Sequence, residues 1–225
     1  MSRTPGPWSY SSLKLFEQCA RRYYEEKVIK SVPFTETEAT IYGTELHKAA
    51  EEYIRDGKEI DPRFAFIKPY LDKLNAIEGT KHCEMKLGVK RVDGKLIPCD
   101  FFDKEVWFRG VADLVILDGD MAWVIDYKSS KSARYADIRQ LALMAAALFL
   151  KYPEIKKIKT SLLFVVSKEF IKEDFKKDFG LSIFAELNGL LTVRDKAYET
   201  NVWNPRPNGL CRRFCPIKTC PHCGE

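Results

Sequence analysis

The sequence predicts an α/β fold in which a mixed central sheet is flanked by helices. In the first eighty residues, apolar side chains recur every three or four positions, which is the spacing of amphipathic helices. From residue 81 to residue 128 the period becomes two, which is typical of strands. An alanine- and leucine-rich segment, an apolar run and a polar segment then predict helix, strand and helix. Such an order of elements is typical of helices packed around one sheet.

Three helices are expected in an N-terminal helical region, residues 1–80. The first runs from Ser9 to Ile29 and can be capped by one of its initial serines. The second runs from Glu36 to Arg55 and stops at Asp56-Gly57. The third opens at Asp61-Pro62 and continues to about Glu78, because proline favours the first turn of a helix.

A meander of four strands should follow, and these strands open the central core, residues 81–200. Asp93-Gly94 and Asp118-Gly119-Asp120 supply turns, because Asp and Gly tolerate the positive φ of tight hairpins. The expected strands are Lys81 to Val92, Lys95 to Asp100, Glu105 to Leu117 and Met121 to Lys128.

The rest of the core should contain two helices and a buried strand. Ala133 to Tyr152 predicts a helix, Ile158 to Val166 a strand, and the polar stretch from Glu169 to Glu199 a further helix. A Pro- and Asn-rich loop, Asn201 to Gly209, then leads into a cysteine-rich tail, residues 201–225. We expect all three regions to form one compact domain, since 225 residues suffice for a single core.

Composition is ordinary for a globular protein, with 45% hydrophobic and 31% charged residues. The longest apolar run, Leu141 to Leu150, is too short to cross a bilayer, and the first residues lack the apolar stretch of a signal peptide. We therefore expect a cytoplasmic protein without a membrane partner. The net charge of +5 favours a polyanionic partner, and Lys131 and Arg134 are candidates for phosphate contacts.

An acidic motif interrupts two of the expected strands. Asp113 falls inside an apolar run, where a charge is costly to bury unless it is paired or binds a metal. Asp126 and Lys128 are two residues apart on the next strand, so their side chains share a face. Two carboxylates and an ammonium group at the end of a hairpin can hold a divalent cation and orient a hydroxide nucleophile. This pattern indicates phosphodiester hydrolysis.

The motif Gly110-Val111-Ala112-Asp113, followed by Asp126-Tyr127-Lys128, resembles the core of the PD-(D/E)XK nuclease superfamily in its RecB-like branch. That branch includes phage exonucleases and CRISPR-adaptation nucleases. The resemblance covers about Ser9 to Cys220 and implies a restriction-endonuclease-like αβββαβ core behind a helical cap. It also implies that Asp113 and Asp126 bind Mg²⁺ or Mn²⁺ and that Lys128 assists the attack of water.

The same resemblance suggests two more residues for the metal site. A Gly-x-x-x-His helix upstream of the core supplies a metal-binding imidazole in RecB-like nucleases, and Gly43 and His47 match it. Related phage exonucleases place another acid near the metal, a position that Glu84 matches. A solvated position on a strand explains Glu84 equally well.

Candidates for DNA contacts lie beyond the acidic motif. Gln140 matches the Gln of a Q-x3-Y helix motif that contacts DNA or steadies the active site in this branch, although Met144 stands where Tyr is usual. Tyr127 and Tyr135 are candidates for base or sugar contacts, or for simple packing.

Seven cysteines in a chain expected in the cytoplasm favour metal binding over disulfides. In one interpretation the four tail cysteines bind Zn²⁺, with His222 as a substitute ligand. In the other, Cys19 and three tail cysteines hold a [4Fe–4S] cluster. The four tail cysteines are Cys211, Cys215, Cys220 and Cys223.

The family resemblance favours the cluster. Its iron–sulfur members carry one Cys after a Ser-x-x-x-Phe-x-x-Cys helix and three near the C-terminus, and Ser12, Phe16 and Cys19 match the first part. The usual tail spacing is C-x2-C-x5-C. Here Cys215 falls one residue late and Cys223 is additional, so Cys211, Cys215 and Cys220 are the expected ligands and Cys223 an alternative.

These features together predict a divalent-metal-dependent deoxyribonuclease. We expect an exonuclease that acts on single strands or duplex ends in recombination, repair or phage DNA metabolism. It would work in the cytoplasm of a bacterium or of a phage-infected host, alone or with other recombination or replication proteins. A structure-specific or site-specific endonuclease is one alternative, and a non-catalytic DNA-binding subunit of a larger complex is another.

Overall fold

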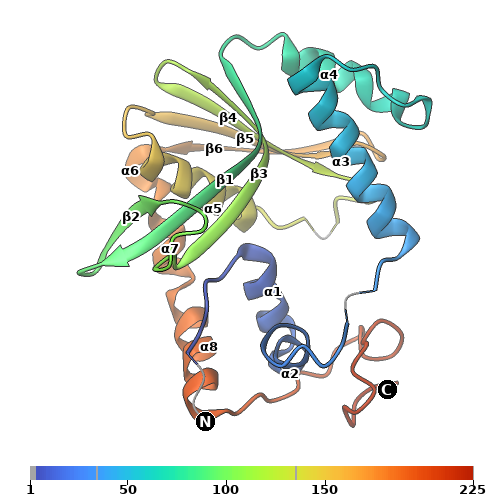
Figure 1. The fold of residues 1–225 in the computed structure, drawn as a ribbon, viewed down its shortest axis with the longest axis vertical. Helices are drawn as coiled ribbons and strands as arrows, with labels where there is room; N and C mark the ends of the chain where they lie inside the picture. Colours follow the sequence, from blue (N-terminus) through green and yellow to red (C-terminus); the bar gives the residue numbers. More distant parts are fainter. Residues whose placement is uncertain (1–3, 34, 135, 225) are drawn as a thin grey trace. The chain divides into compact units, whose positions relative to one another are not determined.

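The computed structural model describes residues 4–33, 35–134 and 136–224 (Figure 1). It forms two compact units. One comprises Glu36–Phe184, and the other combines Met1–Thr35 with Ala185–Glu225. The second unit therefore joins segments from both ends of the chain. Within the described ranges, no helix has the length and apolar character needed to span a membrane.

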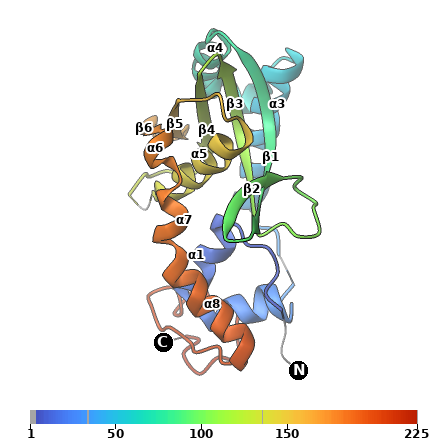
Figure 2. The ribbon, with the colours of Figure 1, turned by 90° about the vertical axis from the view of Figure 1, so that its left-hand side faces the viewer.

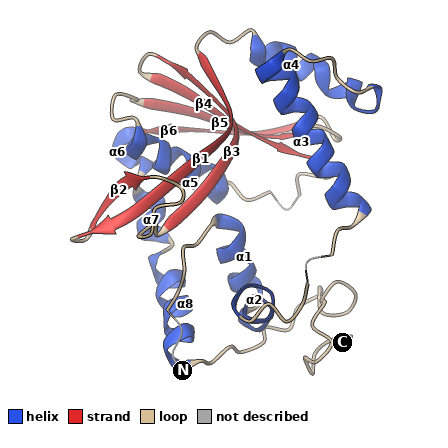
Figure 3. Cartoon of the chain, viewed as in Figure 1, coloured by secondary structure: helices blue, strands red, loops and turns tan. Residues whose placement is uncertain are grey.

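The unit Glu36–Phe184 is built on a six-stranded mixed sheet with strand order β2-β1-β3-β4-β5-β6. Only β4 and β5 are parallel, and every other neighbouring pair is antiparallel. The predicted mixed α/β class is confirmed (Figure 3). The strands are β1 (Thr80–Val92), β2 (Lys95–Cys99), β3 (Phe108–Asp118), β4 (Met121–Lys128), β5 (Lys157–Phe164) and β6 (Glu169–Lys176).

Helices cover both faces of this sheet, as the edge-on view in Figure 2 shows. One face carries α3 (Glu38–Asp56), a 3₁₀ segment (Pro62–Ile67) and α4 (Lys68–Asn75), whose apolar side chains share a core with β3 and β4. The other face carries α5 (Arg139–Lys151), and Leu141 of this helix packs with strand β5. The two buried faces explain why the central strands are almost continuously apolar.

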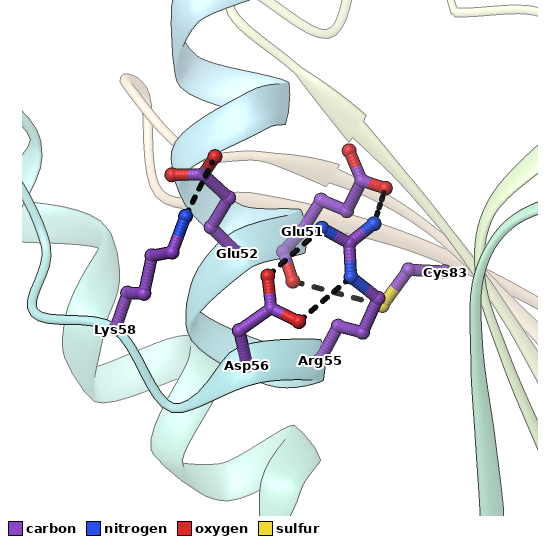
Figure 4. Close-up of polar contacts among 6 residues, drawn as sticks. All are labelled: Glu51, Glu52, Arg55, Asp56, Lys58 and Cys83. Carbon is purple, nitrogen blue, oxygen red and sulfur yellow. Dashed lines mark hydrogen bonds and ion pairs between the residues drawn. The ribbon is translucent and has the colours of Figure 1, made fainter.

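A polar network closes the C-terminal end of α3 (Figure 4). Arg55 forms ion pairs with Glu51 and with Asp56, the latter at 2.8 Å. The half-buried thiol of Cys83 on β1 donates to the Glu51 carbonyl at 3.9 Å. Burial raises the pKa of Cys83 to about 11, so this thiol stays protonated and ties the helix end to the sheet.

The first predicted helix is interrupted in the structure. Its residues form α1 (Tyr10–Gln18), α2 (Ala20–Tyr23) and a π-helical turn (Tyr24–Val28). Cys19 separates α1 from α2 with an extended backbone, φ −164° and ψ 110°. The break between the two helices therefore falls at a residue that carries a thiol.

An aromatic cluster joins the two chain ends of this second unit. Trp203 stacks on Tyr24 at a ring separation of 5.0 Å, and the hydroxyls of Tyr23 and Tyr198 are 3.1 Å apart. Tyr198 belongs to α8 (Asn188–Thr200), and Phe16 of α1 meets Tyr23 edge-on at 5.5 Å. Aromatic burial therefore holds residues almost two hundred positions apart in one small core.

The prediction of a continuous helix from Glu169 to Glu199 was wrong. Its first part is the edge strand β6, and the rest forms α6 (Lys177–Gly180), α7 (Ser182–Glu186) and α8. Ile171 and Phe175 are four residues apart, which imitates a helical stripe, although both are half-buried beside β5. Backbone pairing with β5 along the whole of β6 overrides this local pattern.

Candidate active site

Two carboxylates face each other across the central strands β1 and β3. The antiparallel register pairs Cys83 with Leu114 and Met85 with Ala112, which leaves Glu84 and Asp113 opposite each other between these pairs. Glu84 has φ 51°, a left-handed conformation that is uncommon for a residue with a side chain. Such strain costs about 1–3 kcal/mol and concentrates at functional sites.

His47 approaches the carboxylates from α3. Its Nδ1 atom lies 3.4 Å from Oδ2 of Asp113. His47, Glu84 and Asp113 each offer one ligand atom, and these atoms all lie within 4.8 Å of one another. A Cβ on Gly43, one turn earlier, would lie 3.2 Å from Oγ of Ser129, so glycine allows α3 to approach the segment after β4.

Asp126 and Lys128 form a second polar group at the end of β4. Lys128 Nζ lies 2.5 Å from Oδ2 of Asp126 and donates a hydrogen bond to Oε1 of Gln140 at 3.0 Å. The amide nitrogen of Gln140 in turn donates to Oδ1 of Asp126. Gln140 of α5 thus holds both the carboxylate and the ammonium group, a dual contact that the sequence did not reveal.

Asp113 links the two groups. Its Oδ2 atom accepts a hydrogen bond of 2.7 Å from the backbone N–H of Tyr127, which lies between Asp126 and Lys128. The ladder between β3 and β4 pairs Leu114 with Ile125 and is not continued at Asp113. The Asp113 side chain therefore takes a position where the strand pairing ends.

Charge repulsion and burial perturb the acids of the site. Burial raises the pKa of Asp126, and the charge of Asp113 raises it further, although Lys128 offsets part of the effect. Burial also raises the pKa of Glu84, with Asp113 again contributing. Burial lowers the pKa of His47, but the hydrogen bond and charge of Asp113 outweigh it, so the net shift is upward.

A divalent cation fits this set of groups. Carboxylate oxygens with a single imidazole suit Mg²⁺ or Mn²⁺, and a cation would relieve the repulsion between the acids. His47, Glu84 and Asp113 already converge, whereas the Asp126 carboxylate is engaged by Lys128 and Gln140. Arranged in this way, the groups can bind a metal ion beside an ammonium group.

The candidates for DNA contacts differ in their accessibility. Lys131 and Arg134 are exposed in the segment between β4 and α5. Tyr127 is only 3% exposed and packs in the core, which corresponds to the packing alternative and leaves no access of its ring to a base. Its contribution is the backbone N–H described above. Tyr135 lies outside the described residues.

The cysteines form a separate group in the unit that contains the chain ends. Cys19 and all four tail cysteines line one small pocket, together with His222. The backbone N–H of Arg206 donates to Sγ of Cys19 at 3.5 Å, and that of Asn208 donates to Sγ of Cys211 at 3.4 Å. Hydrogen bonds of this kind orient sulfur ligands and stabilise their negative charge.

Comparisons with known proteins identify the family and the fold. The family model of the PD-(D/E)XK nuclease superfamily matches residues 7–221. The crystal structure of SSO0001 has 16% sequence identity and a TM-score of 0.50, and the alignment covers 99% of this chain and 90% of that one. A protein from Eubacterium rectale, provisionally named an exonuclease, has 12% identity and a TM-score of 0.55, with 91% of this chain and 85% of that one covered.

At these identities the two structures establish a shared fold. No curated protein matches the sequence. The family match spans nearly all of the chain, including the strands that carry Asp113, Asp126 and Lys128. The chain belongs to the PD-(D/E)XK nuclease superfamily.

Proposed function

We propose that this protein is a divalent-metal-dependent deoxyribonuclease that degrades single-stranded DNA or duplex ends as an exonuclease. Its context would be recombination, repair or phage DNA metabolism in a bacterial or phage-infected cytoplasm, alone or with other recombination or replication proteins. The observation that carries the proposal is the convergence of His47, Glu84 and Asp113 beside the Asp126–Lys128 pair. The similarity to a protein provisionally named an exonuclease supports an exonuclease over an endonuclease.

The residues divide the chemistry between them. His47, Asp113 and Asp126 would hold Mg²⁺ or Mn²⁺, with Glu84 as an additional acid. When bound, such an ion stabilises the charge that develops on the phosphate and on the leaving oxygen. The ammonium group of Lys128 orients the attacking water, and Gln140 fixes Lys128 and Asp126 relative to each other.

A cleavage assay on matched linear and circular single strands tests this function. The wild type should release nucleotides from the linear strand in Mg²⁺ or Mn²⁺ and leave the circle intact. Asp113→Asn should lower the rate by about 100-fold or more, because it removes a carboxylate from the metal site. Asp120→Asn is the matched control, since Asp120 is an exposed acid paired with Lys156 at 3.1 Å.

The alternatives predict different products. An endonuclease would cut the circle as readily as the linear strand. A non-catalytic DNA-binding subunit would cut neither while still binding both. Either result would replace the exonuclease proposal.

We also propose that Cys19 and three tail cysteines hold a [4Fe–4S] cluster, with Cys211, Cys215 and Cys220 as ligands and Cys223 as the alternative. The position of Cys19 in the same pocket as the tail supports this arrangement over a zinc site confined to the tail. The backbone N–H groups directed at Cys19 and Cys211 support it as well.

Anaerobic purification with metal analysis distinguishes the two metals. A cluster should give a broad visible absorption band together with iron and sulfide. Cys19→Ser should lose that iron, while Cys99→Ser, a half-buried thiol on β2, should keep it. A colourless protein that keeps one Zn²⁺ in both variants would contradict the cluster.

A further inference from the structure

One face of strands β1 and β3 carries two cations in line with the metal site. Along β3, Arg109, Val111 and Asp113 are half-buried and alternate with fully buried residues. Arg109 therefore shares a face with Asp113, about 13 Å away along the strand. Lys86 of β1 is the cross-strand partner of Val111, and its side chain projects from the same face.

The loop after β2 brings two aromatic rings to these cations. This loop crosses β1 at Gly88, where a Cβ would lie 2.8 Å from the carbonyl oxygens of Cys99 and Asp100. The Asp100 carboxylate then accepts a hydrogen bond of 2.7 Å from the backbone N–H of Phe102 and holds the turn. Phe101 and Phe102 meet edge-on at a ring separation of 5.1 Å.

Both rings lie close to positive charge. Lys86 Nζ is 5.1 Å from the centroid of Phe102 and 5.9 Å from that of Phe101. The guanidinium carbon of Arg109 is 5.3 Å from the Phe101 centroid. Phe102 nevertheless remains 67% exposed, which leaves most of its surface free to stack on a ligand.

Among the residues that the structure describes, the two cations have no carboxylate partner. In the described part of the chain, neither Lys86 nor Arg109 forms an ion pair with a carboxylate. Lys90, two strand positions beyond Gly88, shows the contrast, because it pairs with Asp103 at 3.3 Å and with Glu105 at 3.6 Å. An exposed aromatic ring above two available cations suits a ligand with a flat base and a negative backbone.

We propose that Lys86, Arg109, Phe101 and Phe102 form a subsite for single-stranded DNA. One base stacks on Phe102, and the adjoining phosphates contact Lys86 and Arg109, a few nucleotides from the bond that is cut. The subsite favours a single strand, because bases inside a duplex are already stacked on their neighbours, whereas unpaired bases are free to stack on an aromatic side chain. The inference rests on the proposed nuclease function and specifies how its substrate is held.

Fluorescence anisotropy of a labelled twelve-nucleotide oligothymidylate tests the subsite, with Ca²⁺ as the divalent ion. Phe102→Ala should weaken binding about 5-fold or more, because stacking on an aromatic ring contributes strongly for each base. Lys86→Ala should weaken binding and lower the slope of log affinity against log salt by about 0.7, the value for one phosphate contact on a single strand.

Phe170 and Lys172 on β6 provide matched controls. Lys172 Nζ lies 5.4 Å from the Phe170 centroid, and Phe170 is 46% exposed. The pair therefore places an exposed ring beside an ammonium group at the opposite edge of the sheet. Phe170→Ala and Lys172→Ala should leave DNA affinity within about 2-fold of the wild type. A strand with abasic positions in its centre should abolish the effect of Phe102→Ala and preserve that of Lys86→Ala.

The outcomes separate this proposal from the nuclease function. If the wild type binds and cuts DNA while the Phe102 and Lys86 variants behave like the β6 controls, the cluster is only surface packing and the subsite is refuted. If the variants lose affinity for polyglutamate as strongly as for DNA, the cluster is a general anion site, which also refutes it. A wild type that neither binds nor cuts DNA overturns both proposals.

Discussion

At the scale of single residues, the candidate site is a group of acids that the metal-free protein cannot fully neutralise. Asp126 is buried near Asp113, and both effects raise its pKa. Folding must therefore place a charge where neutral forms are preferred. Sites built for function commonly carry such a cost in stability.

Replacing Asp126 should expose that cost. Asp126→Asn keeps the oxygen that accepts from Gln140 but removes the charge. Because the folded pKa lies above the unfolded one, ionisation of Asp126 destabilises the native state as pH rises past the unfolded value. The metal-free variant should gain on the order of 1 kcal/mol in unfolding free energy at neutral pH and lose cleavage activity.

Chemical denaturation at two pH values measures this effect. The stability difference between the variant and the wild type should be larger at neutral pH than below pH 3.8, the unfolded pKa, where Asp126 is protonated in both states. Asp120→Asn at the surface should change stability by less than about 0.5 kcal/mol at either pH. If Asp126→Asn is less stable than the wild type, the ion pair with Lys128 stabilises the protein by more than burial of the carboxylate costs.

The sequence predicted the residues of the site unevenly. Asp113, Asp126 and Lys128 stood out because charges interrupt apolar strands in a recognisable order. The sequence left open whether Glu84 belongs to the metal site, because its left-handed backbone is a property of the folded strand. The dual role of Gln140 depends on how α5 packs against β4, which local spacing does not encode.

At the scale of elements, the elements with strong periodicity were predicted well. The four strands of the meander and the helix α3 lie within a few residues of their predicted bounds. The misassigned β6 and the interrupted first helix share a physical reason. In both, tertiary contacts decide the backbone, through pairing with β5 in one case and through the extended residue Cys19 in the other.

The strained position on β1 leads to a test at this scale. Glu84→Gly should raise the free energy of unfolding by about 1 kcal/mol, because glycine adopts positive φ without steric cost. The same change should weaken Mn²⁺ binding, since it removes an acid from the His47 group.

Lys168, with φ 59° in the exposed turn before β6, is the matched control. Lys168→Gly should also stabilise the protein but leave Mn²⁺ binding unchanged. Thermal unfolding and titration calorimetry measure both quantities. Equal Mn²⁺ affinity in the two variants would remove Glu84 from the metal site.

At the scale of the whole molecule, one compact unit is assembled from both ends of the chain. Its core is the aromatic cluster around Trp203, and its pocket contains Cys19 with the tail cysteines. The other unit lies entirely between these ends in sequence. A cluster bound to Cys19 and the tail would close a loop of nearly the whole chain.

Loss of such a cluster should destabilise the protein more than loss of a local metal site. A long loop costs more entropy to close than a short one, and metal binding contributes directly to folding. Cys19→Ser should therefore lower the melting temperature of the anaerobically purified protein by several degrees or more. Cys99→Ser should change the melting temperature little. Equal melting temperatures for both variants would contradict the proposal that a cluster connects Cys19 to the tail.

Titration of the metal-free protein with Mn²⁺ tests the central claim most directly, because it measures the site without depending on the choice of substrate. The wild type and Asp120→Asn should bind Mn²⁺ with equal affinity, whereas Asp113→Asn should lose at least about 10-fold in affinity. Unchanged binding by Asp113→Asn would show that the metal, if bound, lies elsewhere, and the account of this site as the nuclease centre would fail.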